Sequence, residues 1–346
     1  MRREADAASG SGLPRPPRAR TDEAALEALA RDAGLSPIGV APLAGDAGRR
    51  RYSRLALAGG GTAIGVVYPP EEDDSRRRWN AARELLSGRV RVPALVADDG
   101  EGRQIVEDFG TEDLAERFSS KPEERGPWLW RCAAVAARIA GMDDPGLNPA
   151  FDAALFHREL DLAREAVFDM LLESPLPPDA RRAHDRWAEG LASEVAAHPY
   201  ALCHRDYHAN NLFPAGDDAG VIDFQDLRRG PDTYDVASLM WERTTLSWMS
   251  PGAARDTLEA FAAARRQDAD SLSQRLSRVL LQRAWKVCGT FARAIACGRG
   301  DAYRRYLPAE LTLVRRLLAE AEADPGGAGN DGAFAAVLRE RAAALG

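Results

Sequence analysis

One segment of the chain reads His204-Arg205-Asp206-Tyr207-His208-Ala209-Asn210-Asn211 and is followed shortly by Val221-Ile222-Asp223-Phe224. It places two carboxylates and a carboxamide, those of Asp206, Asp223 and Asn211, in one short stretch. Residues 216–220 have turn composition, and Leu212-Phe213 and Gly220-Val221-Ile222 flank them as two short apolar strands. We therefore predict a hairpin that brings Asn211 and Asp223 side by side.

These three side chains match the requirements of phosphoryl transfer. A phosphoryl group in transfer carries several negative oxygens, so it needs Mg²⁺, ligands that hold the ion, and an acceptor for the hydroxyl proton. Asn211 and Asp223 offer the hard oxygen ligands that Mg²⁺ prefers. Asp206 precedes Asn211 by five residues, the spacing of the H-R-D-x-x-x-x-N catalytic loop, and is therefore the predicted general base.

Each residue taken alone also has a purely structural interpretation. An H-R-D triplet can be a solvated loop, and Asp223 can be a turn former at the end of a strand. The base and both metal ligands occur together, in order and next to predicted strands, and this combination favours a phosphotransferase.

Polar neighbours of these residues are further candidates. His208 and Asn210 lie between the base and the first metal ligand, and we predict that they contact substrate or phosphate. Asp226 is predicted either to bind a substrate hydroxyl or the metal shell, or to form an Asx turn, and both remain open. His204 is expected to buttress the loop by hydrogen bonding. Asp235 begins an apolar helical pattern and is expected to cap that helix or brace the loop.

Composition limits the class of protein. The chain has 346 residues, 45% of them hydrophobic, and a formal charge of -7, so it can bury one large core or two lobes without oligomerising, and a monomer is expected. The acidic balance, without a basic domain, argues against nucleic acid as the main partner. No apolar run reaches membrane-spanning length, and residues 1–20 lack the apolar core of a secretory signal. We expect a cytoplasmic protein whose four separated cysteines are buried free thiols, namely Cys132, Cys203, Cys288 and Cys297.

Hydrophobic patterns divide the chain into four parts. Residues 1–20 are predicted to be disordered, and residues 21–110 to form a small nucleotide-binding lobe around an antiparallel sheet. This lobe is expected to hold a helix from Thr21 or Asp22 to Gly34, a second helix at 73–86, and strands at 38–43, 52–57, 62–68, 92–97 and 103–107. Residues 111–323 are predicted to be a large helical lobe, and 324–346 a flexible tail with a short helix at 334–345.

The helical lobe is expected to be interrupted only by the catalytic hairpin. Its predicted helices are 123–139, 154–172, 179–196, 234–249, 253–265, 271–296 and 302–323. The chain is therefore predicted to be an α+β protein with two lobes.

The order of these parts resembles the aminoglycoside phosphotransferase and choline kinase superfamily, which implies a protein-kinase-like fold. Over about residues 37–320 the chain is most similar to bacterial anomeric kinases of N-acetylmuramate and N-acetylglucosamine. The resemblance lies in Arg50-Arg51-Tyr52-Ser53-Arg54, Pro69-Pro70-Glu71, Glu107-Asp108-Phe109-Gly110, Val221-Ile222-Asp223-Phe224-Gln225-Asp226, Gly230-Pro231, Tyr234-Asp235, Leu281-Gln282-Arg283, Lys286-Val287 and Gly289-Thr290-Phe291-Ala292-Arg293.

That resemblance implies an ATP- and Mg²⁺-dependent kinase that phosphorylates the anomeric hydroxyl of an amino sugar in peptidoglycan recycling. Two alternatives remain open, an aminoglycoside or other small-alcohol kinase and a nucleotide-binding pseudokinase. Residues 241–248 are expected to form the wall of the acceptor pocket. Arg283 and Lys286 are expected to hold an acidic partner within the helical lobe or to reach the carboxylate of a muramyl sugar.

The nucleotide side of the site departs from protein kinases. The backbone of Glu107, Asp108 and Phe109 is the predicted hinge that binds adenine. The third strand, Ala63-Ile64-Gly65-Val66-Val67-Tyr68, carries no lysine for the phosphates.

Arginine is the predicted substitute for that lysine. Arg50 and Arg54 share one face of a strand by period two and Arg51 lies on the other, so guanidinium groups can hold phosphate. Three solvated arginines on an edge strand is the open alternative. The glycine-containing loop at residues 44–49 can contact phosphate through its backbone or can be an ordinary hairpin turn.

Overall fold

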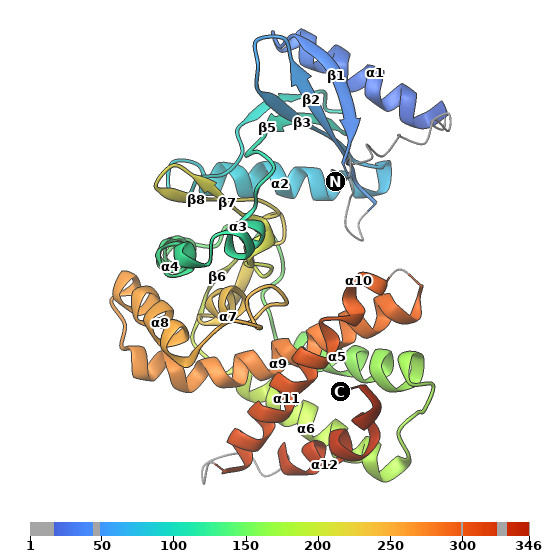
Figure 1. Ribbon diagram of the computed structural model, residues 1–346, viewed down its shortest axis with the longest axis vertical. Helices are drawn as coiled ribbons and strands as arrows, with labels where there is room; N and C mark the ends of the chain where they lie inside the picture. The colour runs from blue at the N-terminus through green and yellow to red at the C-terminus, as the bar shows by residue number, and fades with distance from the viewer. Residues whose placement is uncertain (1–16, 44–48, 299, 324–330, 346) are drawn as a thin grey trace, which may run out of the picture. The chain divides into compact units, whose positions relative to one another are not determined.

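Alternating polar and apolar residues in the N-terminal part build one antiparallel sheet. The computed structural model describes residues 17–43, 49–298, 300–323 and 331–345 (Figure 1). Its contacts divide the chain into unit 1, the described residues of 1–77 and 93–108, and unit 2, those of 78–92 and 109–346. The sheet of unit 1 has the order β1-β2-β3-β5-β4, formed by β1 (Pro37–Pro42), β2 (Arg51–Leu57), β3 (Thr62–Val67), β5 (Arg103–Glu107) and β4 (Leu95–Asp98).

One helix covers this sheet. Helix α1 (Pro17–Asp32) places Leu26 and Ala30 in a core with Leu55 of β2 and Ile105 of β5. Gly65 allows the close approach, because a Cβ at this position would lie 2.8 Å from a methyl group of Leu26. The five predicted strands and the helix that packs on them are therefore present.

Unit 2 consists mainly of helices. Helix α2 (Asp73–Leu86) begins in unit 1 and ends in unit 2. The others are α3 (Leu114–Ser120), α4 (Arg125–Ala140), α5 (Ala153–Arg164), η3 (Glu165–Leu171, a π-helical continuation of α5), α6 (Pro178–Ala196), α7 (Tyr234–Met240), α8 (Pro251–Arg265), α9 (Ala269–Ala296), α10 (Asp301–Arg304), α11 (Leu307–Ala323) and α12 (Asp331–Arg341). Single 3-10 turns are η1 (Pro70–Glu72), η2 (Pro122–Glu124), η4 (Ala209–Asn211) and η5 (Ala343–Leu345).

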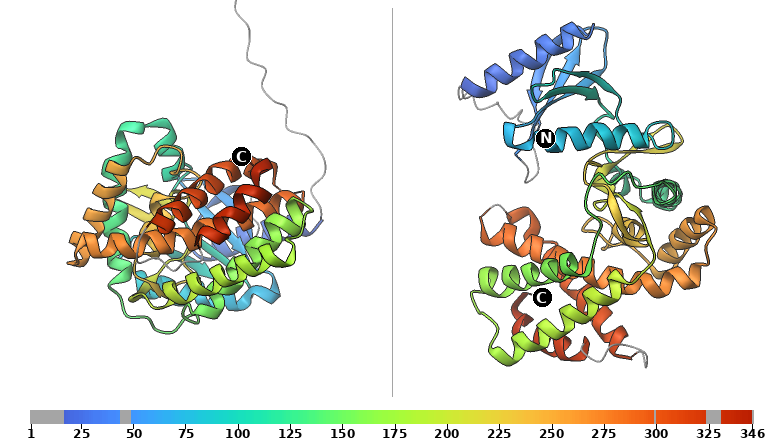
Figure 2. Two further views of the ribbon diagram at one scale, coloured as in Figure 1. Left: turned by 90° about the horizontal axis from the view of Figure 1, so that it is seen from below. Right: turned by 180° about the vertical axis from the view of Figure 1, so that it is seen from behind.

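Helix α9 is the centre of this helical part. It begins at the cap Asp268, which accepts a hydrogen bond from the backbone of Ser271, and it packs against α5, α6, α7, α8 and α11 (Figure 2). Gly289 allows α5 to approach, because a Cβ there would come within 2.4 Å of the Cα atom of Ala163. The last helix, α12, packs on α6 and α11, and its Phe334 is buried and stacks on Trp187 with ring centroids 4.1 Å apart. Helix α12 is thus part of the helical core.

Two short sheets interrupt the helices of unit 2. The predicted hairpin is formed by β7 (Leu212–Ala215) and β8 (Asp218–Val221). The prediction that it is the only interruption was wrong, because β6 (Tyr200–Cys203) pairs with β9 (Arg228–Pro231) in a second sheet. The sequence of β9 is Arg-Arg-Gly-Pro, which lacks the apolar alternation by which a strand is recognised.

Other element predictions need correction. Residues 17–20 are helical rather than disordered, while residues 1–16, most of the glycine-containing loop (44–48) and 324–330 lie outside the described residues. The helix predicted at 234–249 ends at Met240, since Trp241 leaves the helical conformation, and the one predicted at 302–323 is divided into α10 and α11. Cys297 is exposed, whereas Cys132, Cys203 and Cys288 are buried free thiols as predicted. Among the described residues, no helix combines the length and the apolar character needed to cross a bilayer.

Candidate active site

The hairpin brings the two predicted metal ligands together. The backbone N–H of Ile222 donates to the carbonyl of Asn211 at 3.1 Å, next to the pairing of Leu212 with Val221. Asn211 and Asp223 therefore lie at the adjoining ends of the two strands. Phe224, which follows Asp223, is buried and stacks on Trp79 with centroids 5.3 Å apart, so the strand end is anchored in unit 2.

Two residues of the site have left-handed backbones. Arg205 has φ 82° and Asp223 has φ 62°, a conformation that is uncommon for residues other than glycine. Asp235 holds the first of them, because its carboxylate accepts the N–H of His204 at 2.6 Å and that of Arg205 at 2.9 Å. Arg283 donates to the Arg205 carbonyl at 2.9 Å. Asp235 thus braces the loop, one of the two roles predicted for it.

His204 connects the loop to the hairpin. Its ring is fully buried, and Nε2 lies 2.9 Å from the carbonyl oxygen of Ile222. A carbonyl only accepts, so Nε2 carries the proton in this arrangement. This is the buttressing role that the sequence predicted.

The carboxylate of Asp206 is available for a ligand. It accepts no hydrogen bond from any residue that the structure describes, while its backbone carbonyl accepts the Nδ2–H of Asn211 at 2.9 Å. Burial acts to raise the pKa of Asp206, but the positive charges of Lys286 and then Arg205 outweigh it and hold this pKa well below its usual range. The carboxylate is therefore charged at neutral pH and can orient a hydroxyl.

The donor set fits Mg²⁺. Asn211 uses its Nδ2 atom in the bond to Asp206, so its Oδ1 atom is the one suited to a cation. Asp223 is oriented by Gln225, whose Nε2 donates to Oδ1 of Asp223 at 2.9 Å. The carbonyl of Gln225 in turn accepts from Nδ2 of Asn148 at 3.0 Å. The sequence predicted no role for Gln225 or Asn148, and the residues around Asn148 form no recognisable motif.

The predicted substrate contacts have distinct surroundings. Nδ2 of Asn210 donates to Asp113 at 3.1 Å, and Oδ1 of Asn210 accepts from Arg243 at 3.5 Å, so its amide is engaged on both sides. Burial lowers the pKa of His208, against the negative charges of Glu242 and Asp206, and its Nδ1 atom has no hydrogen-bond partner in the described chain. His208 is thus a neutral ring at physiological pH.

Asp226 forms no Asx turn within the described residues. Its negative charge acts instead on Arg205 and Arg228, and in both cases it favours the charged guanidinium. It is therefore part of the electrostatic surroundings of Asp206.

Three cations lie in or near the loop, namely Arg205 of the loop itself, Arg228 of β9 and Lys286 of α9, and we call them the cationic cluster. Nη2 of Arg205 lies 3.6 Å from the Glu159 carboxylate, and the guanidinium of Arg228 lies over the ring of Phe151 at 5.3 Å.

Lys286 is only partly buried and remains charged. Burial acts to lower its pKa, but nearby Tyr234, Glu159 and Asp206 raise it. Arg283, on the same helix, is buried and lies 3.7 Å from the carboxylate of Glu242, so it has the structural role that was one of its two predictions.

In unit 1, each of the three predicted phosphate-binding arginines faces a carboxylate. Arg54 makes two hydrogen bonds to Asp108, at 2.6 and 3.2 Å. Nε of Arg50 lies 3.7 Å from Glu72, and Nε of Arg51 donates to Asp22 at 3.0 Å. Since only 17% and 23% of the Arg50 and Arg54 side chains are exposed, the alternative of three solvated arginines is wrong for these two.

Two of the predicted hinge residues, Glu107 and Phe109, are each held by contacts within their own unit. Glu107 exchanges hydrogen bonds with Ala94 in unit 1, at 2.9 Å through the backbone and 3.1 Å through its carboxylate. Phe109 belongs to unit 2, where the guanidinium of Arg91 lies 4.8 Å from its ring and Phe213 packs at 6.0 Å.

Trp241, at the start of the expected acceptor wall (residues 241–248), lines a cavity. This cavity of about 420 Å³ in unit 2 is lined by Trp241, Met249, Leu258 and Leu276, and its lining includes none of the residues of the catalytic loop. Trp248 instead packs edge-on to Phe118 at 5.4 Å. The acceptor wall stays a prediction.

Comparison with known proteins identifies the family to which this chain belongs. Residues 39–273 match the model of a family described as phosphotransferase enzyme family. The chain belongs to this family. Within it, the chain is 31% identical over 279 residues to an N-acetylmuramate/N-acetylglucosamine kinase of Pseudomonas putida, which covers 76% of this chain and 77% of that protein. It is 30% identical over 217 residues to the protein of the same name from Pseudomonas aeruginosa, which covers 62% of this chain and 63% of the relative, less than two thirds of its length.

Solved structures agree with this phosphotransferase fold. A choline/ethanolamine kinase family protein from Mesorhizobium loti matches with a TM-score of 0.59 at 16% identity, over 92% of this chain and 99% of the other. An amicoumacin kinase in complex with AMP-PNP and Ca²⁺ matches with a TM-score of 0.56 at 13% identity, over 86% and 96%. The predicted protein-kinase-like α+β fold and the assignment as a kinase enzyme are confirmed.

Proposed function

We propose that this phosphotransferase transfers the γ-phosphoryl group of ATP to the anomeric hydroxyl of N-acetylmuramate, N-acetylglucosamine or both, as a step of peptidoglycan recycling. The names of its relatives support the acceptor, and the nucleotide complex of a structural neighbour supports ATP as donor. A reaction that consumes ATP further favours the cytoplasm. The observation that carries the proposal is the hydrogen bond by which Asn211 is fixed to Asp206, beside the hairpin end that holds Asp223.

In the proposed reaction Asp206 orients the acceptor. Its carboxylate accepts the proton of the sugar hydroxyl, whose oxygen forms a new bond to the γ-phosphorus while the bond from that phosphorus to the bridging oxygen of ADP breaks. ADP leaves with the electron pair, and the proton passes to Asp206 and then to solvent. Because the pKa of Asp206 is low, proton transfer comes late and the main contribution of this residue is position.

Asn211 and Asp223 would hold Mg²⁺ through Oδ1 and a carboxylate oxygen. The bound ion would neutralise charge on the triphosphate. Gln225 and Asn148 are positioning residues for Asp223, because their hydrogen bonds connect the left-handed turn to the helical core.

On the nucleotide side, we assign the backbone of residues 107–109 to adenine. Arg50 and Arg51 are assigned to phosphate, which would replace their present carboxylate partners, Glu72 and Asp22. Arg54 acts through its bidentate pair with Asp108, which orders the hinge from within unit 1.

The charges around Asp206 favour an anionic acceptor. N-acetylmuramate differs from N-acetylglucosamine by a carboxylate, and the cationic cluster offers it Lys286, which acts on the base directly, and Arg228, which lies near Arg205. A polycationic aminoglycoside would be repelled by the same groups. His208, Asn210 and Asp226 are assigned to the hydroxyl and acetamido groups of the sugar, with Asn210 aligned by Asp113.

A panel of acceptors tests this proposal. The purified chain with ATP and Mg²⁺ is offered N-acetylmuramate, N-acetylglucosamine, kanamycin and choline, and products are identified by mass and by the ³¹P–¹H coupling of an anomeric phosphate. We expect product from the two acetylated sugars and none from Asp206→Ala, with unchanged circular dichroism. Turnover of kanamycin with inert sugars would overturn the acceptor assignment, and no turnover of any acceptor would favour a binding role.

A further inference from the structure

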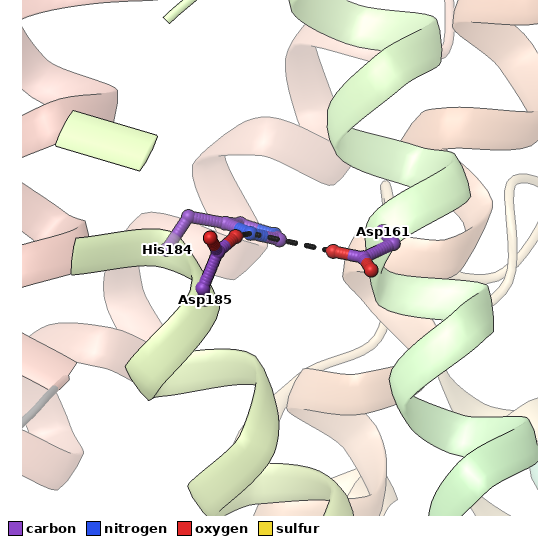
Figure 3. A group of neighbouring side chains, drawn as sticks. All are labelled: Asp161, His184 and Asp185. Atoms are coloured by element: carbon purple, nitrogen blue, oxygen red, sulfur yellow. Dashed lines mark hydrogen bonds and ion pairs between the residues drawn. The ribbon is translucent and has the colours of Figure 1, made fainter. Parts of the chain in front are cut away.

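A second group of metal-binding side chains lies between α5 and α6. His184 of α6 is fully buried, and its Nδ1 atom lies 3.4 Å from Oδ1 of Asp185 and 3.8 Å from Oδ1 of Asp161 on α5 (Figure 3). His157 precedes Asp161 by one helical turn, and its Nδ1 atom lies 3.6 Å from the other carboxylate oxygen, Oδ2. We call these four residues the His-Asp cluster, to which each helix contributes one histidine and one aspartate.

Hydrogen bonding does not account for this arrangement. The contact of His184 Nδ1 with Oδ1 of Asp185, at 3.4 Å, is a long hydrogen bond, and Oδ1 of Asp161, at 3.8 Å, is beyond hydrogen-bonding distance. Nδ1 carries at most one proton, yet two carboxylates face it. Oδ1 of Asp161 is buried and has no hydrogen-bond partner among the described residues. Such an oxygen is costly to leave unsatisfied unless a ligand from solution binds it.

Neighbouring protein cations do not fill the gap. Arg164 is paired with Glu165 and Asp169 at 3.2 and 3.1 Å. Arg181 reaches only the outer oxygen of Asp185, at 3.9 Å, and both are largely exposed.

The spacing suits one metal ion. Zinc binds imidazole nitrogen and carboxylate oxygen at about 2.0–2.2 Å, so two ligand atoms of a tetrahedral ion lie about 3.3–3.6 Å apart. The separations of 3.4 and 3.8 Å are close to this value. Asp161, His184 and Asp185 each offer one ligand atom, and these three atoms lie within 4.8 Å of one another. A neutral imidazole is also the form of histidine that binds a metal.

We propose that Asp161, His184 and Asp185 bind a zinc-class divalent cation that ties α5 to α6, with solvent completing its coordination. The carboxylates are about one-third to one-half exposed, which gives the ion access from solvent. The same α5 carries Glu159, which contacts Arg205 of the catalytic loop and accepts a hydrogen bond from Gln282. The ion therefore stabilises the helix pair that supports the loop and takes no part in phosphoryl transfer.

The test uses tag-free, chelator-treated full-length protein in millimolar Mg²⁺, which occupies sites selective for hard oxygen ligands. Zinc is titrated by calorimetry, and cobalt is titrated by its visible d–d absorption. We expect one equivalent of each, an intense tetrahedral cobalt spectrum and a higher melting temperature with zinc.

Variants locate the site. Asp161→Asn and Asp185→Asn are each expected to weaken zinc binding about 10- to 100-fold. Two control variants should still bind one equivalent of zinc. They are Asp179→Asn, at an exposed position of α6, and Asp223→Asn, in the proposed active site. Zinc binding by the Asp161 and Asp185 variants as tight as that of the wild type, loss of binding in Asp223→Asn instead, or no stoichiometric binding by the wild type would overturn the proposal. Because metal binding is read without turnover, failure here leaves the proposed kinase activity unaffected.

Discussion

The carboxamide of Asn211 donates a hydrogen bond to the backbone carbonyl of Asp206, at 2.9 Å. The predicted metal ligand and the predicted base are therefore parts of one hydrogen-bonded loop. This hydrogen bond fixes the positions of Asn211 and Asp206 relative to each other, in addition to their joint role in the proposed reaction.

Asn211→Asp tests this link, because it keeps an oxygen ligand for the metal and removes the donor to Asp206. A carboxylate facing a carbonyl oxygen repels it, so the loop should open. We expect kcat to fall about 100-fold or more, a loss typical of a displaced catalytic group. Steady-state kinetics over a range of Mg²⁺ concentrations measures the effect. An unchanged kcat with only a shifted Mg²⁺ requirement would mean that the link has no role in catalysis.

Gln225→Glu tests the positioning of Asp223. The substitution places a second carboxylate 2.9 Å from Oδ1 of Asp223, where Gln225 now donates. Repulsion should rotate Asp223, and the concentration of Mg²⁺ at half-maximal activity should change at least about 10-fold. Gln267→Glu, at an exposed position after α8, is the matched control and should leave that concentration unchanged. Equal behaviour of the two variants would contradict the positioning role.

The sequence predicted those parts of the site whose residues are close together in the chain. The hairpin follows from apolar runs around a turn, so Asn211 and Asp223 could be placed together without coordinates. The brace by Asp235 was one of two roles expected for it, and the structure selects it.

Pairings between residues far apart in the chain could not be predicted from local patterns. The strand β9 has no apolar alternation and forms only because it pairs with β6, residue Arg228 facing Cys203. The left-handed conformation of Arg205 is held by hydrogen bonds from Asp235 of α7 and Arg283 of α9, which are distant in the chain. Ion pairs such as Arg54 with Asp108, 54 residues apart, depend on the whole sheet. Tertiary context therefore decides the details on which the chemistry depends.

The pH dependence of the reaction should reflect the cations around Asp206. Since its pKa is held well below the usual range, the base stays ionised on mild acidification, and kcat/KM should show no acid limb from this group down to about pH 5. Lys286→Met removes the largest of the charges that lower this pKa, so the acid limb should move toward neutral pH. Profiles of kcat/KM against pH for both proteins provide the measurement.

The control for this shift is Lys121→Met, at the surface before η2. It should keep the wild-type profile. A Lys286→Met profile that falls in height but keeps its shape would show that Lys286 binds substrate without tuning Asp206.

Glu310 of α11 should make stability depend on pH in the opposite direction to most carboxylates. It is buried, neither of its oxygens has a hydrogen-bond partner among the described residues, and burial, then the charge of Glu242, raises its pKa well above the ordinary value of 4.5. The folded state thus holds the proton more tightly than the unfolded chain. The stabilisation is complete below pH 4.5 and decreases as the pH rises above it toward the folded-state pKa.

Glu310→Gln, which is neutral at every pH, should remove this decrease. At neutral pH its free energy of unfolding should exceed that of the wild type by about 1.4 kcal/mol or more, the value of one pKa unit. Urea denaturation at a series of pH values from acid to neutral measures how the free energy of unfolding of the wild type and of Glu310→Gln changes with pH. The matched control is Glu320→Gln, on the exposed face of the same helix. If Glu310→Gln is less stable than the wild type at neutral pH, Glu310 is charged and has a partner that the substitution removes.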